Sequence, residues 1–236
     1  MTEPDRGGRD SFNRLRRGTL AEQVLEAVTN KLFAGELRPG DRLAEAELAA
    51  EMGISRSPVR EALAELQKDG LLIKEPGRQA VIREWTSRDL EELYDLRAML
   101  EGYAVRLAAE RVTPADLSTL HGIVGAMWSS IQREEYQELL HLDFEFHREI
   151  WRLSNHSLLQ QTLKTISLQT RFFIAINFGI HSDPAEVPRL HQEILNALGK
   201  DSPERLEKLL QEHLHRAVKL MLGAYQAGVE ALVETS

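Results

Sequence analysis

The sequence predicts a mainly α-helical protein in two parts: an N-terminal unit of three helices with a small β-hairpin, followed by an all-α antiparallel bundle of about six helices. Three observations support this fold class. Apolar residues recur at helical spacing through most of the 236 residues, and capping residues and glycines mark the helix ends. Runs that favour strands flank the turn at Pro76-Gly77. A hydrophobic content of 42% with 28% charged residues is typical of a globular protein.

The charge is distributed unevenly along the chain. The chain contains 29 Lys and Arg residues and 37 Asp and Glu residues. Taken as a single number, the net charge of −8 argues against a nucleic-acid-binding protein. Residues 1–88, however, hold 15 basic and 15 acidic residues, so the whole acidic excess lies in residues 89–236. We therefore expect two domains with different partners and a boundary near Glu84–Arg88, where Ser87 would cap the next helix.

Composition also excludes several classes of protein. The absence of cysteine excludes a disulfide framework, a cysteine-based zinc finger and a thiol nucleophile, and it fits the cytoplasm, where we expect the protein to act. No apolar run approaches the roughly 18 residues of a membrane span, so no membrane partner is expected. Residues 1–18 contain five arginines and are expected to form a flexible arm, either a solvated tail or a basic arm that touches phosphates.

The unit over residues 19–84 is expected to begin with three helices. Thr19 caps the first, Gly35 ends it, and a Pro-Gly turn follows. Leu43 is expected inside the second helix, which Gly53 ends. The third helix starts at Ser55 and has four apolar residues on its buried face: Val59, Ala62, Leu63 and Leu66.

The second and third helices have the spacing of a helix-turn-helix, because a short glycine-containing turn joins them. Four polar residues occupy the start of the third helix and face away from its apolar side: Ser55, Arg56, Ser57 and Arg60. Arginines at this position can reach guanine edges or phosphates in a major groove. The alternative is a small three-helix domain with an exposed arginine pair.

A β-hairpin is expected after the third helix. The runs Leu71–Glu75 and Gln79–Arg83 favour strands, and Pro76-Gly77-Arg78 lies between them. This hairpin would form a wing with Arg78 at its tip.

The bundle over residues 88–228 is expected to contain about six helices, and no convincing strand is apparent in it. Its first helix follows Ser87. The other five are expected to run from Thr113-Pro114, from about Glu134 to Leu153, over Leu158–Phe178, from Asp183-Pro184 to Gly199, and from Ser202-Pro203 to about Gly228.

All eight histidines follow residue 120, and some have the spacing of metal ligands. Asp143 and His147 are four residues apart, so both project from one face of a helix. His191 and His213 lie on two later helices, and facing helices of a bundle can bring such side chains together. Asp143 and His213 also stand among apolar neighbours, where a polar group needs a partner. The alternative is an ordinary hydrogen-bonded Asp–His pair.

The N-terminal unit resembles the winged helix-turn-helix of GntR-family bacterial transcription regulators. The resemblance rests on Gly53–Leu63 with Leu66 and Gly70-Leu71, and on the upstream Gly35, Leu37–Gly40 and Glu47–Ala49. It covers about residues 19–83. It implies binding of a double-stranded DNA operator, with contacts through Ser55, Arg56, Ser57, Arg60 and the wing tip.

The second unit resembles the FCD effector domain of the FadR-type subfamily. The matching features are Asp143-x-x-x-His147 followed by His191 and His213, and the first-helix runs 96–101 and 107–110. The resemblance implies that these four residues bind a divalent metal ion. It also implies that Arg97 and Asn177 line an effector cavity. Alternatively, Arg97 forms a buried ion pair with a glutamate of the bundle and Asn177 caps a helix end.

Three imidazoles and one carboxylate suit Zn²⁺ or Ni²⁺ better than Mn²⁺ or Fe²⁺. We therefore expect a homodimeric, metal-dependent transcription regulator, a repressor, that binds a palindromic operator and senses a small carboxylate-bearing effector. One alternative is a metal with a purely structural role. A metalloenzyme is the other, but the sequence lacks His-Glu-x-x-His and an evident general base, so we expect no enzymatic activity.

Overall fold

The computed structural model describes residues 19–75, 77–176 and 183–234. The chain divides into two compact units between Arg83 and Glu84, and each unit is described by itself. The predictions made for the arm 1–18 and for Asn177 lie outside the described residues.

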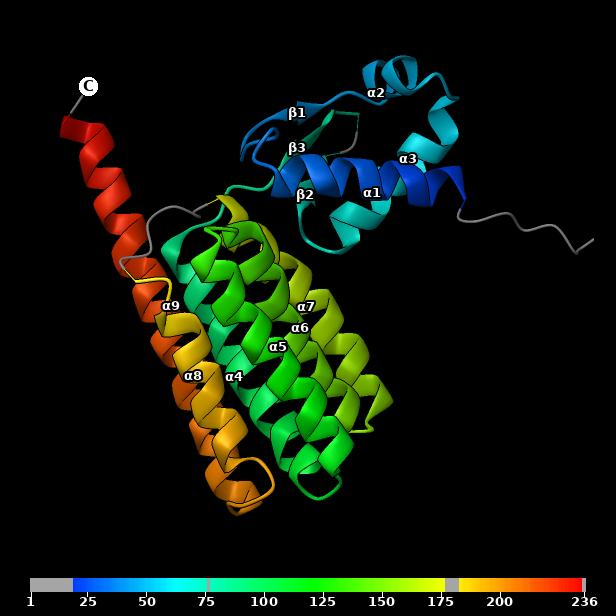
Figure 1. The fold of residues 1–236 in the computed structure, drawn as a ribbon. Helices are drawn as coiled ribbons and strands as arrows, with labels where there is room; N and C mark the ends of the chain where they lie inside the picture. The colour runs from blue at the N-terminus through cyan, green and yellow to red at the C-terminus, as the bar shows by residue number, and fades with distance from the viewer. Residues whose placement is uncertain (1–18, 76, 177–182, 235–236) are drawn as a thin grey trace, which may run out of the picture. The chain divides into compact units, whose positions relative to one another are not determined.

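The first unit contains three helices and one small antiparallel sheet (Figure 1). The helices are α1 (Leu20–Phe33), α2 (Glu45–Met52) and α3 (Arg56–Lys68). The strands β1 (Arg42–Leu43), β2 (Leu72–Ile73) and β3 (Ala80–Ile82) have the order β1-β3-β2. Helices α1 and α3 pack together, and the buried residues of the two helices include Val24, Val28, Leu32, Val59 and Leu66.

The third strand corrects the prediction for Leu43. Leu43 does not belong to the second helix but pairs with Ala80 across the sheet, and its side chain is buried. Helix α2 begins only at Glu45, after Ala44 in an extended conformation. The strands β2 and β3 are shorter than the predicted runs, so the wing is a minimal hairpin extended by β1.

Local signals set two of the predicted boundaries in this unit, at Thr19 and at Gly53. The side chain of Thr19 accepts a hydrogen bond from the backbone N–H of Glu22, and the Glu22 carboxylate accepts one from the backbone N–H of Thr19. Gly53 ends α2 with a φ of 65°, a left-handed conformation that glycine adopts without strain. The turn between α2 and α3 therefore follows directly from the sequence.

The second unit consists of helices over its described residues: α4 (Ser87–Ala109), α5 (Pro114–Gln132), α6 (Tyr136–Leu153), α7 (Ser157–Ile176), α8 (Glu186–Ala197) and α9 (Pro203–Glu234). Thr113 caps α5 as predicted. The cap of α4 is Thr86 and not Ser87, because Thr86 forms the capping box with Asp89. Helix α9 continues beyond the predicted end at Gly228.

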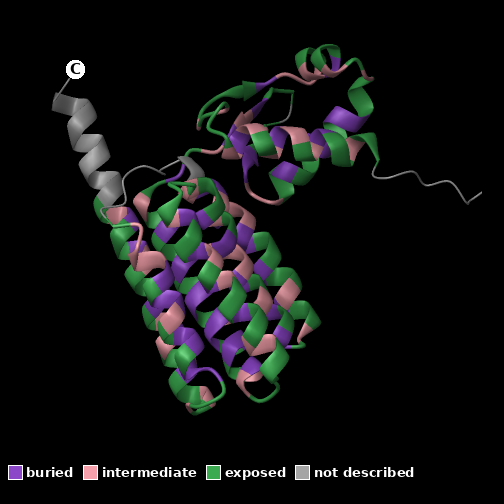
Figure 2. Cartoon of the chain, in the orientation of Figure 1, coloured by how far each residue is buried: buried purple, intermediate pink, exposed green. Residues whose placement is uncertain are grey.

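Helix α4 packs against α6, α7 and α9, and buried side chains line the helix faces that meet (Figure 2). Gly102 lies where α4 meets α9: a Cβ atom there would be 3.0 Å from Nε2 of Gln211. Two charged residues of α4, Arg97 and Glu101, are buried. No helix of the described chain has the length and apolar character needed to cross a membrane.

Candidate metal centre and DNA-binding face

Three histidines from three helices meet in the interior of the bundle. His147 of α6, His191 of α8 and His213 of α9 are buried, and one ring nitrogen of each lies within 4.8 Å of the others. The Nε2 atom of His147 is 3.4 Å from Nε2 of His191 and 3.3 Å from Nε2 of His213. The predicted convergence of these side chains is therefore present in the structure.

Neighbouring groups orient two of the imidazole rings. Nδ1 of His191 lies 2.8 Å from the backbone oxygen of Val187. Because a carbonyl oxygen only accepts, Nδ1 carries the proton and donates a hydrogen bond to it. Nδ1 of His147 lies 2.6 Å from a carboxylate oxygen of Glu101. In His191, Nε2 is then left with its lone pair, the form in which imidazole binds a metal, whereas Nδ1 of His147 faces the Glu101 carboxylate at an ion-pair distance without forming a hydrogen bond among the described residues.

The histidine cluster fits a metal ion. Two lone pairs on adjacent Nε2 atoms cannot satisfy one another, so the cluster needs a cation or a proton between them. Nitrogens about 2.0–2.1 Å from a tetrahedral Zn²⁺ are roughly 3.3–3.4 Å apart, which matches the spacings around His147. Nδ1 of His213 is buried without a hydrogen-bond partner among the described residues. These three residues could hold a metal ion.

Burial favours the neutral form of two imidazoles, those of His191 and His213. It lowers the pKa of His191 to about 4, and the attraction of Asp143 offsets this only in part. Burial also lowers the pKa of His213 well below its usual value, and the neighbouring His191 and His147 lower it further. Neutral imidazoles are ready to bind a metal without first losing a proton.

Glu101 joins the histidine cluster to Arg97. One carboxylate oxygen accepts a hydrogen bond from Nε of Arg97 at 2.8 Å, and the other accepts one from Nε1 of Trp151 at 3.1 Å, beside His147. Burial raises the pKa of Glu101, but Arg97 and His147 outweigh this effect and lower the pKa to about 2. Glu101 is therefore a buried carboxylate anion, held by these three side chains.

Asp143 adjoins the cluster on its exposed side. One of its carboxylate oxygens lies 3.3 Å from Nε2 of His191, and its side chain is 25% exposed. Its apolar sequence neighbours Leu142 and Phe146 turn into the core, whereas Asp143 lies beside His191, which supplies the partner that the carboxylate needs. His141 and His215, each two residues from a site residue, are about half exposed and do not join the cluster.

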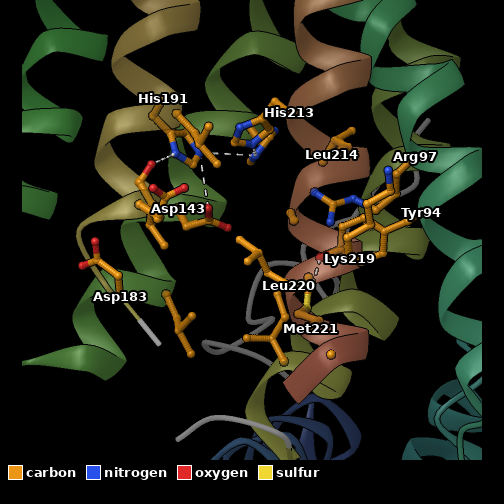
Figure 3. A pocket seen from close by; sticks show the side chains of 18 residues that line it. Tyr94, Arg97, Asp143, Asp183, His191, His213, Leu214, Lys219, Leu220 and Met221 are labelled. Atoms are coloured by element: carbon orange, nitrogen blue, oxygen red, sulfur yellow. Dashed lines mark hydrogen bonds and ion pairs between the residues drawn. The ribbon is translucent and has the colours of Figure 1, made fainter. Parts of the chain in front are cut away.

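A cavity of about 420 Å³ opens beside the histidines. Figure 3 shows His191 and His213 at one end, Arg97 and Tyr94 along one side, and Leu220 and Met221 away from the histidines. Most of its other described lining residues are apolar, among them Leu140, Ile174, Leu190 and Ala217. Arg97 thus both forms the buried ion pair with Glu101 and lines the cavity, so the two expectations for this residue are compatible.

The predicted DNA-contacting residues are exposed at the start of α3. Ser55, Arg56, Ser57 and Arg60 are all exposed, whereas Pro58 and Val59 are buried. Arg78 is exposed in the wing, and its Nε lies 3.0 Å from Glu75. The helix therefore presents a polar, basic edge to solvent.

Sequence reasoning missed two glutamates that organise these sites. Glu101 contacts Arg97 four residues away on the same helix, a spacing that the sequence does display. Glu45 contacts both Arg56 and Arg60 from the preceding helix. Its signal was weak, because nothing in the sequence distinguishes it from the neighbouring Glu47.

Comparisons with known proteins agree on one family. The FCD domain profile matches residues 92–216, and the profile described as bacterial regulatory proteins, gntR family, matches residues 20–82. The "Probable D-xylose utilization operon transcriptional repressor" of Paenarthrobacter nicotinovorans is 30% identical over 94% of this chain and 97% of its own length.

Two further comparisons concern one Escherichia coli protein. The HTH-type transcriptional regulator McbR of strain K12 is 27% identical over 90% of this chain and 97% of its own. The solved structure of E. coli McbR/YncC superposes with a TM-score of 0.74 at 26% identity, and the match covers 89% of this chain and 100% of the other.

Proposed function

This chain belongs to the GntR family of transcription regulators and carries an FCD domain; from that premise we propose that it is a metal-dependent repressor that senses a small organic acid. Residues 19–84 form the DNA-binding head and residues 88–228 the effector-binding and dimerisation domain. The relatives are regulators and not enzymes, so the histidine cluster has no catalytic role.

One observation carries the proposal: three buried imidazoles converge on a cavity whose side is lined by the guanidinium of Arg97. We assign His147, His191 and His213 as metal ligands and Asp143 as the fourth, with Zn²⁺ or Ni²⁺ as the ion. The bound ion would supply a Lewis acid with open coordination positions for a carboxylate. Arg97 and Asn177 are the proposed effector-binding residues, and Arg97 would bind the carboxylate in bidentate fashion.

The described lining also suggests which acids the cavity favours. The guanidinium of Arg97 lines one side of the cavity and the proposed metal ion would add positive charge at the histidines, whereas Leu190, Leu220 and Met221 offer apolar surface. An acid with an apolar body buries that surface, which stabilises the complex by about 25 cal/mol per Å². We therefore propose a small carboxylate with an apolar part as the effector.

An exposed apolar face of the bundle supports a homodimer. Leu96, Met99 and Tyr103 follow one face of α4, and Met99 is 65% exposed. The ring of Tyr103 contacts His156 at the start of α7, where Leu158 is 66% exposed. Exposed apolar residues grouped on adjacent helices indicate an interaction site, and we assign this face to a second copy of the chain.

Two-fold symmetry would then present two heads to a palindromic operator. Ser55, Arg56, Ser57 and Arg60 would enter the major groove, and Arg78 would contact the backbone or minor groove from the wing. The effector would act through its different affinities for the DNA-binding and released arrangements of the dimer.

A thermal-shift screen tests the proposal. The protein would be loaded with Zn²⁺ or Ni²⁺ and melted with a series of small organic acids. We expect the metal alone to raise the melting temperature and at least one acid to raise it further, because a ligand that binds only the folded state stabilises it. A shift with metal but none with any acid would favour a purely structural metal and contradict the sensing function.

A further inference from the structure

The carboxylate of Glu45 lies at the junction of three DNA-facing elements of the head. Its Oε1 accepts a hydrogen bond from Nζ of Lys74, which follows strand β2, at 2.7 Å. Its Oε2 accepts bonds from Nε of Arg60 at 3.2 Å and from Nη2 of Arg56 at 3.4 Å. One acid of α2 thus contacts two arginines of α3 and the base of the wing.

Burial differs sharply across this cluster. The side chain of Glu45 is 13% exposed, whereas those of Arg56 and Arg60 are 61% and 62% exposed. The carboxylate therefore lies beneath the arginines, and an approaching nucleic acid meets the cations first. Attraction of Lys74 and Arg60 outweighs burial and lowers the pKa of Glu45 to about 2, so the anion persists at neutral pH.

The geometry leaves the arginines able to bind DNA. Arg60 uses Nε toward Glu45 and keeps its terminal nitrogens, and Arg56 uses one terminal nitrogen and keeps its other donors. Two guanidinium groups one helical turn apart repel each other, and each free arginine side chain loses rotamer entropy when it is fixed on DNA. A shared buried anion reduces both costs before the DNA arrives.

We propose that Glu45 is a positioning residue for operator recognition: it holds Arg56 and Arg60 in a fixed orientation and ties the wing to the same point through Lys74. The inference rests on the proposed DNA contacts of these arginines. Glu45 itself need not touch DNA. Its effect should therefore appear in the discrimination between DNA sequences more than in the total affinity.

The test compares three variants with the intact protein. The specific probe is a duplex enriched by the wild-type protein from a random library, and the competitor is the same duplex with its sequence scrambled. Glu45→Gln removes the charge while keeping the shape. Glu45→Asp keeps the charge but withdraws the carboxylate by one methylene, and Glu47→Gln is the control that removes an exposed charge from the same helix.

We expect Glu45→Gln to bind the scrambled duplex more tightly and with a steeper salt dependence, because one more cation becomes available for phosphates. Its ratio of specific to non-specific affinity should fall about tenfold or more, the discrimination that one bidentate contact supplies. Glu45→Asp should lose a comparable part of that ratio while its salt dependence stays near that of the wild type. Glu47→Gln should change both affinities together and leave their ratio unaltered.

The outcomes separate this inference from the proposed function. A wild-type protein that enriches no duplex contradicts the sequence-specific regulator itself. The wild-type protein can discriminate between the duplexes while the Glu45 variants keep the ratio of specific to non-specific affinity found in the wild type or in Glu47→Gln. That outcome would overturn only the role of Glu45. Melting curves of each variant show whether the head is folded. If Glu45→Gln does not fold, the ratio of specific to non-specific affinity is tested with Glu45→Asp.

Discussion

A carboxylate oxygen of Glu101 lies 2.6 Å from Nδ1 of His147, and both side chains are buried. A carboxylate behind an imidazole fixes which ring nitrogen carries the proton, and it makes the other nitrogen a better metal ligand. Because Glu101 also binds Arg97, the proposed effector-binding residue and the proposed metal ligand share one anion. This relationship is the basis of the first prediction.

Glu101→Gln should weaken metal binding by about 10- to 100-fold, since the neutral amide no longer supports the imidazole. It should also lower the free energy of unfolding by about 3–5 kcal/mol, because Arg97 stays buried without its counter-charge. Metal titration and chemical denaturation measure the two effects. Glu92→Gln is the matched control: Arg88 and Glu92 have the same spacing on the same helix but are exposed, so little should change. Wild-type metal affinity in Glu101→Gln would show that Glu101 has no role in the site.

His147→Ala should abolish metal binding, because Nε2 of His147 is close to the Nε2 atoms of both other histidines. Elemental analysis of the purified variant after incubation with Zn²⁺ or Ni²⁺ measures the bound metal. His141→Ala, which replaces an exposed residue of the same helix, is expected to retain it. A stoichiometric metal content in His147→Ala would refute the assigned site.

Arg60→Ala should cost about 1–3 kcal/mol of specific DNA binding, since the residue is assigned to a base edge. Electrophoretic mobility shifts with the enriched duplex measure the loss. Lys68→Ala removes one exposed charge from the other end of the same helix and should have a much smaller effect. Unchanged affinity in Arg60→Ala would exclude α3 as the recognition helix.

Met99→Glu should convert the proposed dimer into monomers, because two like charges would meet across the α4 face. Sedimentation velocity measures the oligomeric state, and the affinity for the palindromic duplex should fall as the two heads lose their linkage. Trp128→Glu, on α5, replaces another exposed apolar residue and should leave the dimer intact. A dimeric Met99→Glu would place the interface elsewhere.

Two glycine substitutions test the close approach of α4 and α9. Gly125→Ala should stabilise the protein by about 0.5–1 kcal/mol, because a Cβ atom there meets nothing within 4 Å and alanine favours the helix. Gly102→Ala should gain less or lose stability, since Gln211 and Glu207 would have to move. Thermal unfolding measures both. Equal gains in stability at the two positions would mean that the side chains of α9 move away from residue 102 at no cost in free energy.

Local signals explain which parts of the fold the sequence could predict. Thr19, Gly53 and Thr113 act on neighbouring backbone groups, so the helix boundaries that they set were predictable. Strand β1 was not, because Leu43 gains its partner only when Ala80 folds back beside it. A two-residue strand also carries no periodicity of its own.

The same distinction applies to the sites. The three histidines were predicted from spacing and resemblance, and the structure brings them together. The roles of Glu45 and Glu101 depend on contacts between elements. Glu45 contacts Lys74, which is 29 residues away in the sequence, and Glu101 contacts Trp151, which is 50 residues away. Such contacts arise from packing, which the sequence pattern of one element does not encode.

The separation of the histidines along the chain has a consequence for how the proposed metal would be acquired. His147 is 44 residues from His191 and 66 from His213, so an unfolded chain brings their nitrogens together only by closing two long loops. Uptake of the proposed metal would therefore follow folding. If the metal site is real, synthesis in metal-poor medium should yield folded apoprotein that binds the ion afterwards.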